Sequence, residues 1–189
     1  MPSSFRNMVV TLSVVTLVSA LALGYVYEWT KEPIAQARLA TQLEAISEVL
    51  PGYDNNPVDE QFNTVAENGD TLVFYPAVSN SASVGTAVKV RSGKGYSGDI
   101  WLMVGLDTAG VVHNIVVLSH RETPGLGSKI ESEGFIFQFL QKHVSSFQVK
   151  KDGGSVDAIS GATISSRAYC DAVNRARDAF MQKKKNHDH

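Results

Sequence analysis

The sequence predicts an α+β protein, in which an N-terminal transmembrane helix precedes a domain whose antiparallel sheet is covered by helices. Three observations predict this fold class. Residues 7–27 form an uncharged apolar run, residues 71–118 contain strand-like segments separated by turns, and residues 131–182 contain helical patterns. Strands joined by short turns pair in antiparallel fashion, and each helix must bury its apolar face, so we expect helices packed on one sheet.

The uncharged run NMVVTLSVVTLVSALALGYVY occupies residues 7–27. As a helix it would be about 30 Å long, which is enough to cross the core of a bilayer. Aromatic residues that favour the membrane interface stand at its far end: Tyr25, Tyr27 and Trp29. Because Arg6 precedes the run, we expect a single-pass anchor with its N-terminus inside and the remaining chain outside. A cleaved signal peptide is the alternative, although the run is longer than the usual signal core.

We expect four regions along the chain. The transmembrane anchor is residues 1–30, and a juxtamembrane helix and linker is residues 31–70. Apolar residues follow a helical spacing in the second region: Leu39, Leu43, Ile46 and Leu50. This helix ends at Pro51-Gly52 and either stands off the membrane as a stalk or lies on the domain. The globular domain is residues 71–182, and residues 183–189 are a charged, frayed tail.

The expected strands of the domain are rich in β-branched and aromatic residues. They are residues 71–76, 86–91, 100–106 and 111–118. The last two are almost continuously apolar, so both of their faces should be covered, most simply by sheet on one side and helix on the other. Helical patterns at residues 131–141 and 165–182 can supply the helices. One face of the second pattern is apolar: Tyr169, Ala172, Val173, Ala176 and Phe180.

The composition excludes several classes of function. The net charge is -2 and no long basic stripe occurs, which argues against nucleic acid as a partner. Cys170 is the single cysteine, so we expect a small buried residue without a disulfide, an iron–sulfur cluster or a zinc site. His113 and His120 show no acidic partner and are interpreted as structural, and the tail histidines alone make no metal site. Redox chemistry would therefore need an organic cofactor.

The loop SHRETPGLGSKI, residues 119–130, follows an expected strand and precedes an expected helix. Pro124 fixes one backbone dihedral, whereas Gly125 and Gly127 permit positive φ and close approach of the backbone. Such a loop can present amides to a planar or anionic ligand. An ordinary strand-to-helix turn is the alternative, and composition alone favours it.

The segment DAISGATISS, residues 157–166, stands before the last helical pattern. Ser165 or Ser166 would serve as the N-cap of that helix, which explains the serines without any function. Gly161 and Ala162 have almost no side chain and leave room beside Thr163. A hydroxyl just upstream of a helix also lies where amide donors would stabilise an attached phosphate. Simple capping and a phosphate-linked ligand both remain possible from the residues alone.

Three stretches of the chain together resemble one family. The flavinylation motif of the FMN-binding domain family resembles Asp-Ala-Ile-Ser-Gly-Ala-Thr at residues 157–163. Two other stretches resemble RnfG, the G component of the Rnf ion-translocating electron-transport complex. They are GKGYSGDIWLMVGLD at residues 93–107 and HRETPGLG at residues 120–127. With the anchor, the resemblance covers nearly the whole chain. The related C component of the sodium-translocating NADH:quinone reductase (NqrC) is typically longer.

The resemblance implies a covalent FMN, esterified through its phosphate to Thr163 by a flavin transferase. It implies that Ser160 hydrogen-bonds the phosphate, that Gly161 and Ala162 leave room for it, and that Asp157 either serves transferase recognition or caps a local turn. Further residues are expected beside the flavin ring: Glu122, Thr123, Leu126 and Gly127. Tyr96 and Trp101 could stack on a flavin, although packing is their more common role.

The resemblance further implies a flavoprotein that relays electrons on the outer face of the bacterial inner membrane. Its partners would be the other membrane subunits of a complex that couples ferredoxin and NAD to ion movement, and it would turn over no substrate by itself. Two alternatives stay open. One is the C component of the quinone reductase, and the other is an anchored, noncatalytic sensor or scaffold that binds flavin without a covalent bond.

Overall fold

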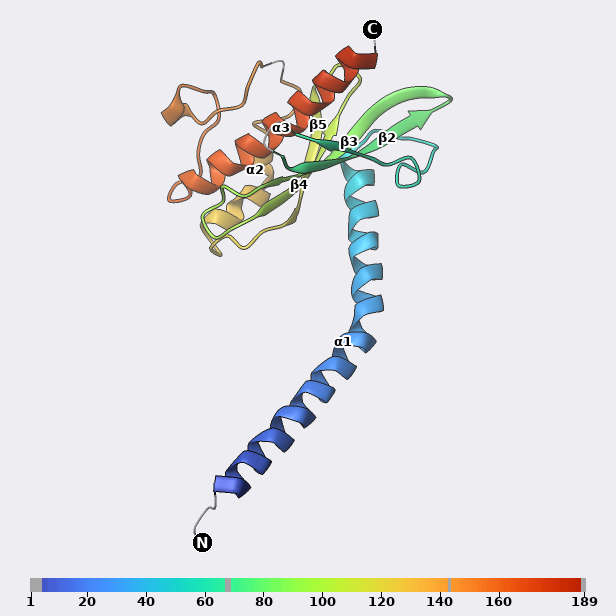
Figure 1. Ribbon diagram of the computed structural model, residues 1–189. Helices are drawn as coiled ribbons and strands as arrows, with labels where there is room; N and C mark the ends of the chain where they lie inside the picture. Colours follow the sequence, from blue (N-terminus) through green and yellow to red (C-terminus); the bar gives the residue numbers. More distant parts are fainter. Residues whose placement is uncertain (1–4, 67–68, 143, 188–189) are drawn as a thin grey trace. The chain divides into compact units, whose positions relative to one another are not determined.

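The computed structural model describes residues 5–66, 69–142 and 144–187. The chain forms two compact units, Met1–Thr41 and Gln42–His189. The second unit holds the whole sheet and every helix except the first part of α1, which spans Phe5–Val49 (Figure 1).

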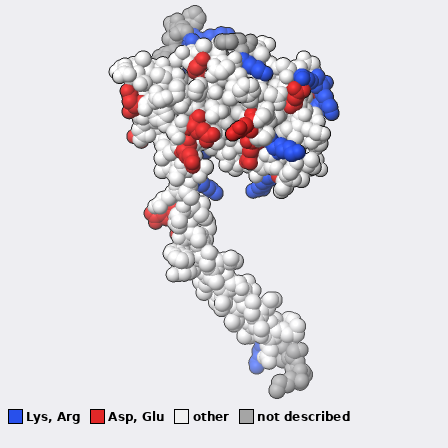
Figure 2. Space-filling view, turned by 180° about the vertical axis from the view of Figure 1, so that it is seen from behind, with Lys and Arg blue, Asp and Glu red and all other residues white. Residues whose placement is uncertain are grey.

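In the first unit, α1 is one uninterrupted helix that includes Pro33. The apolar side chains of its first part are exposed, and it is the one helix in the described part of the chain that is long and apolar enough to cross a membrane. Figure 2 shows its first part as surface with almost no charged side chain. The helix passes from the expected span into the expected juxtamembrane segment without a break, and it ends at Val49, just before Pro51. The end predicted at Pro51-Gly52 is therefore confirmed.

The second unit is built on a five-stranded antiparallel meander in the order β1-β2-β3-β4-β5. The strands are β1 Phe62–Val65, β2 Thr71–Ser79, β3 Ala82–Ser92, β4 Ile100–Leu106 and β5 Val112–Ser119. The predicted α+β class and its antiparallel sheet are confirmed. Only β1 was missed, because its four residues lie in the expected linker. Its Phe62 pairs with Phe74 of β2 and stacks on it at 5.1 Å between ring centroids.

Both faces of the sheet are buried, as the apolar runs predict, but the second face is covered by helix and not by a second sheet. Ala45, Ile46 and Val49 at the end of α1 pack on it against Tyr75 and Met103. Of the four residues of the predicted apolar stripe, Ile46 and Leu50 are buried, whereas Leu39 and Leu43 are exposed.

The opposite face carries the larger core and is covered by α3, Thr163–His187 (Figure 1). The predicted apolar face of this helix is confirmed, with Tyr169, Ala172, Val173 and Ala176 fully buried. Three alanines along this face let the helix axis approach the strands closely: Ala168, Ala172 and Ala176. The hydroxyl of Tyr169 is buried without a hydrogen-bond partner in the described part of the molecule, and burial raises its pKa.

The bounds of α3 differ from the expected ones at both ends. It begins at Thr163, so Ser165 and Ser166 lie in its first turn and neither is the N-cap. It continues to His187, so the segment expected to fray is helical that far. Lys184 Nζ donates to the Thr108 carbonyl at 2.9 Å, which ties this end of the helix to the turn before β5. The expected tail histidine His189 lies outside the described residues.

The helix predicted at residues 131–141 is wrong in extent. The chain forms a 3₁₀ helix η1, Gly127–Glu131, then one turn of α2, Glu133–Ile136, and then a series of turns. The apolar spacing that suggested a helix instead serves an aromatic cluster, in which the rings of Phe135 and Phe139 lie 5.2 and 5.0 Å from Tyr169. A second 3₁₀ helix, η2 at Lys150–Asp152, precedes the DAISGAT segment.

Gly105 of β4 tests the contact between the sheet and the end of α1. A Cβ at this position would overlap the carbonyl group of Val49, which is main chain and cannot rotate away. We therefore expect Gly105→Ala to lower the free energy of unfolding by about 3 kcal/mol, the upper range for overpacking. Chemical denaturation of the full chain in detergent measures it.

Gly52→Ala is the matched control, because nothing lies within 4 Å of the position that its Cβ would occupy. It should change the free energy of unfolding by less than about 0.5 kcal/mol. Equal effects of the two substitutions would show that the end of α1 does not pack on β4 in solution.

Candidate functional site

One cleft brings together the two stretches that the sequence singled out. Its volume is about 600 Å³, which lies in the range of small-molecule sites. The residues that line it are Tyr96, Glu122, Thr123, Leu126, Gly127, Lys151, Gly161, Ala162, Thr163, Ile164 and Ser165. Seven of the nine predicted site residues are in this set, whereas Ser160 and Asp157 are not. Tyr96, for which packing was the more common role, also lines the cleft, together with three residues to which the sequence assigned no cofactor role: Lys151, Ile164 and Ser165.

A tight turn delivers Thr163 to the cleft. The Ala162 N–H donates to the Ile159 carbonyl at 2.9 Å, and Gly161 adopts φ 78°, a conformation that favours glycine. Ser166 fastens the turn from within α3, since its hydroxyl donates to the Ala162 carbonyl at 2.9 Å and accepts from the Ile159 N–H at 3.0 Å. The serine expected to cap the helix instead closes the turn that precedes it.

Glu122 is the buried charge of the site and is only 5% exposed. Its Oε2 accepts a hydrogen bond from Ser165 Oγ at 2.7 Å, and its Oε1 accepts one from the Ser97 N–H at 3.3 Å. A carboxylate withdrawn from water needs such donors. Glu122 therefore joins three segments: its own loop, the first turn of α3 and the loop after β3.

Two glycines give Glu122 its space, although a Cβ at Gly95 would also overlap the Gly98 carbonyl oxygen. A Cβ at Gly127 would lie 2.7 Å from the Glu122 Cβ, and a Cβ at Gly95 would lie 2.6 Å from its Oε1. Both distances are shorter than the contacts that Cβ atoms make in proteins, so any larger residue at either position would force Glu122 or the backbone to move. Gly127 thus serves close packing around Glu122, in addition to lining the cleft.

The loop containing Thr123 and Leu126 is closed by its own hydrogen bonds. The N–H groups of Leu126 and Ser128 both donate to the Thr123 carbonyl at 3.2 Å, and the Gly125 N–H donates to Ser128 Oγ at 2.9 Å. The expectation that this loop presents amides to a ligand is therefore wrong for these three groups. What it presents is the half-exposed side chain of Leu126, which faces Gly161 across the cleft.

His120 supports Glu122 from behind. Its Nδ1 accepts a hydrogen bond from the Glu122 N–H at 3.0 Å, so its Nε2 carries the proton and lies 3.0 Å from Glu131 Oε1. The sequence showed no acidic partner for this histidine, and Glu131 is that partner. Only the folded loop and η1 bring the two together, so no sequence pattern could have identified the pair. His113, by contrast, lies 3.5 Å from Gln141 at the far end of β5.

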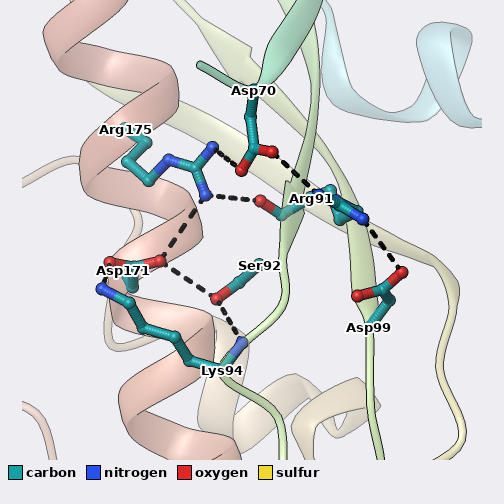
Figure 3. A network of polar contacts seen from close by, with 7 residues as sticks. All are labelled: Asp70, Arg91, Ser92, Lys94, Asp99, Asp171 and Arg175. Carbon is teal, nitrogen blue, oxygen red and sulfur yellow. Dashed lines mark hydrogen bonds and ion pairs between the residues drawn. The ribbon is translucent and has the colours of Figure 1, made fainter. Parts of the chain in front are cut away.

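The loop after β3, residues 93–99, carries Tyr96 and Ser97 and is fixed at both ends. At its start, Lys94 Nζ contacts Asp171 of α3 at 2.6 Å, and Ser92 Oγ donates to the same carboxylate at 3.0 Å (Figure 3). At its end, Asp99 pairs with Arg91 at 3.3 Å. The loop therefore holds the Ser97 N–H in place for Glu122.

Arg175 extends this network away from the cleft. Its guanidinium contacts Asp70 at 2.7 Å and donates to the Arg91 carbonyl at 2.7 Å, while Arg91 also pairs with Asp70 at 2.8 Å (Figure 3). The hydrogen bond that Arg91 donates to Asp70 holds the pKa of Arg91 above its ordinary value. These contacts lock α3 to β3 on the side of the helix opposite the aromatic cluster.

The short helix η2 flanks the other side of the motif. Lys150 Nζ pairs with Asp157 at 2.7 Å, and Asp152 forms a two-point ion pair with Arg167 of α3, with both contacts at 2.7 Å. The Asp157 side chain is exposed, and its backbone N–H donates to Gln138 Oε1 at 2.6 Å. Asp157 thus lies outside the cleft, on the surface beside it.

The remaining candidates lie apart from the cleft. Cys170 is buried on α3, and burial raises the pKa of its thiol to about 12, which fits an unreactive residue. Trp101 lies under the Lys89 ammonium at 5.7 Å and does not line the cleft. Within residues 5–66, 69–142 and 144–187, no cluster of three metal-binding side chains occurs.

Comparison with known proteins identifies the class to which this site belongs. Residues 95–178 match a family model described as FMN-binding domain. The matched range contains the start of the cleft at Tyr96, the Glu122 loop and the whole DAISGAT segment. The fold and cleft therefore define an FMN-binding domain, carried behind an apolar N-terminal helix.

Relatives over the whole length are more specific. The chain is 36% identical to the G subunit of the ion-translocating oxidoreductase complex of Methanosarcina acetivorans, over 91% of this chain and 92% of the relative. It is 35% identical to the protein of the same name from Haemophilus influenzae, over 88% and 86%, and 31% identical to that from Vibrio cholerae, over 96% and 93%. The chain belongs to this family of G subunits, and the resemblance found in the sequence is confirmed.

A solved structure is also similar. The crystal structure of NqrC from Shewanella oneidensis aligns with a TM-score of 0.49 and 20% sequence identity, over 76% of this chain and 73% of that chain.

The contact between Glu122 and Ser165 can be tested by a double-mutant cycle. Each alanine substitution removes the same hydrogen bond, and Ser165→Ala also leaves a buried carboxylate short of one donor, so each should cost about 2 kcal/mol. The double variant should fall short of the sum by at least about 1 kcal/mol. Chemical denaturation of the four full-length chains measures this. Pairing Ser165→Ala with the exposed Glu60→Ala is the control, for which additive effects are expected.

The ion pair between Asp152 and Arg167 predicts a pH dependence. Its hydrogen bond holds the pKa of Asp152 below the ordinary value of 3.8. A carboxyl with a lower pKa in the folded state stabilises the fold above its unfolded pKa, and this contribution is lost as the pH falls through the folded pKa.

Thermal unfolding between pH 5 and pH 2 should therefore show a loss of stability below about pH 4. Asp152→Asn should remove this component and leave the stability at pH 7 lower than that of the unsubstituted chain. Identical pH profiles for both chains would mean that the pair does not form in solution.

Proposed function

We propose that the protein is the membrane-anchored flavoprotein subunit of an ion-translocating oxidoreductase complex, and that it carries FMN esterified through its phosphate to Thr163. The observation that carries this proposal is the single cleft in which Thr163 meets the Glu122 loop. The family to which the chain belongs supports the setting, and its FMN-binding domain supports the cofactor.

The described residues fit such a group. Thr163 is half-buried at the wall of the cleft, and its hydroxyl makes no hydrogen bond within the described ranges. Gly161 and Ala162 leave the approach to this hydroxyl open. Leu126 and Ile164 supply exposed apolar side chains, and Tyr96 supplies an exposed aromatic ring. This combination of a free hydroxyl, a small-residue turn and apolar walls suits a ring system attached through a polar chain.

The residues would divide the work as follows. Thr163 tethers the phosphate, with Ser160 donating to it from the exposed side of the turn. Leu126, Thr123 and Gly127 border the ring, while Glu122 holds their loop against α3 and does not itself need to reach the flavin. The bound flavin supplies the transfer of one or two electrons, and the protein supplies its position and surroundings.

Attachment of the flavin forms one bond, between Thr163 Oγ and the phosphorus of FMN. Direct condensation with loss of water is unfavourable in water, so the phosphoryl group must come from an activated flavin nucleotide whose phosphoanhydride bond breaks. The hydroxyl proton passes to a base, and the nucleotide half leaves as an anion. No redox change occurs. A separate flavin transferase would catalyse this step, with the exposed Asp157 within its reach.

The proposed setting is the bacterial inner membrane. The first part of α1 would cross it with the N-terminus in the cytoplasm and the flavin domain on the outer side, where the other membrane subunits of the complex would exchange electrons with the flavin. A relay of this kind needs no substrate site of its own. The cleft serves one resident group.

The test is a comparison of full-length chains produced together with a flavin transferase. The unsubstituted chain should gain the mass of FMN minus water and keep a flavin spectrum after denaturation, whereas Thr163→Ala should show neither. Thr163→Ser is the matched control, because it keeps a hydroxyl at the same place and should accept at least part of the flavin. An unmodified wild-type chain beside an active transferase would refute the ester and favour noncovalent flavin binding.

A further inference from the structure

We propose that Lys151 is the binding residue for the flavin phosphate, a role that the sequence alone gave to no basic residue. This inference rests on the proposed function, because it concerns the anionic group that Thr163 would carry. The position of Lys151 follows from η2, from the charges that line the cleft and from the ion pairs that its neighbours make.

The two outer residues of η2 have separate partners, whereas the central one has none in the described part of the chain. Lys150 pairs with Asp157 on one side of the turn at residues 159–162, and Asp152 pairs with Arg167 on the other. The residue between them, Lys151, lines the cleft. Its ammonium has no ion pair or hydrogen bond within residues 5–66, 69–142 and 144–187. The two flanking pairs therefore fix the backbone of η2 beside the motif and leave the central charge available.

The pair between Asp152 and Arg167 also locates Lys151 along α3. Thr163 and Arg167 are four residues apart in this helix, so their side chains lie on the same face. Asp152 holds the Arg167 side chain with two contacts of 2.7 Å, and Lys151 is the next residue in the chain. Lys151 is thus placed beside the first turn of α3, on the side where the Thr163 hydroxyl lies.

The charge balance of the cleft favours a cation beside the phosphate, in addition to the amide donors at the start of α3. Glu122 and Lys151 are the charged residues that line it. Glu122 is buried and already accepts from Ser165 and Ser97, so its charge would repel a second anion. A phosphate diester keeps one negative charge at all physiological pH values, and an ammonium is its natural partner. Without Lys151, the phosphate would face a carboxylate with no cation in the lining.

The phosphate and the flavin ring can be distinguished as targets of Lys151. The charge of a diester does not change when the flavin is reduced. A lysine bound to the phosphate therefore stabilises the oxidised and reduced forms equally and leaves the midpoint potential unchanged. A lysine that instead faced the ring would stabilise the reduced anion and raise the potential.

The first test uses the full-length chain in detergent, produced without a transferase and titrated with FMN and with riboflavin, which lacks the phosphate. For Lys151→Gln we expect the dissociation constant of FMN to rise about tenfold, the scale of one charge-assisted hydrogen bond, and that of riboflavin to change less than about twofold. Lys129→Gln is the matched control, since it removes the same charge from an exposed residue of η1 that does not line the cleft. Equal losses for both ligands, or no loss for either, would overturn the proposal.

The second test needs no reversible binding. In the esterified chain, the ³¹P resonance of the phosphodiester should move in Lys151→Gln and stay in place in Lys129→Gln, with the same midpoint potential in all three chains. An unmoved resonance, or a potential that falls in Lys151→Gln alone, would contradict a phosphate partner. Failure of the ester itself is seen separately, as a wild-type chain without added mass, and the ligand titrations on that chain still decide the role of Lys151.

Discussion

The architecture of the site depends on one buried carboxylate. Glu122 obtains its hydrogen bonds from Ser165, 43 residues away along the chain, and from the Ser97 N–H, 25 residues away. A carboxylate so enclosed cannot exchange these donors for water, so the three segments must stay together. The cleft is the space that they leave between them. Glu122 fills the volume where a Cβ of Gly127 would lie, and at Gly95 the Gly98 carbonyl and Glu122 Oε1 together fill it.

The same helix that carries Thr163 also completes the core. The first turn of α3 faces the cleft, and its later turns bury Ala172, Val173 and Ala176 against the sheet. Arg175 donates to the Arg91 carbonyl of β3, and Asp171 binds Ser92 of β3 and Lys94 of the loop after it, so both residues hold the helix against the sheet. The position of the Thr163 hydroxyl is therefore set by the packing of a whole helix, which is far stiffer than a loop. A flavin attached there would be held by the fold itself.

The sequence predicted most of the sheet, since β-branched runs and turn residues marked β2 to β5 clearly. It also predicted seven residues of the cleft, because Thr163 and the Glu122 loop belong to recognisable stretches. It could not predict that Ser166 closes the turn before α3, that Glu131 pairs with His120, or that Lys151 lines the cleft. Each of these depends on contacts between segments whose relative placement no local pattern encodes. The spacing of Phe135 and Phe139 predicted a longer helix than the structure has, because residues that pack on one tertiary cluster can show the same spacing as one face of a helix.

The end of α1 determines where the domain can be separated from its anchor. The sequence left open whether this segment stands off as a stalk or lies on the domain, and the structure buries Ile46 and Val49 completely in the core on the second face of the sheet. If a protease cut at Pro51 and the end of α1 left the domain, Tyr75 and Met103 would become exposed. The released domain would then carry an apolar surface prone to aggregation. A cut before Gln42 would leave that face covered. Release of a soluble flavin domain is thus limited to cleavage within the exposed part of the helix.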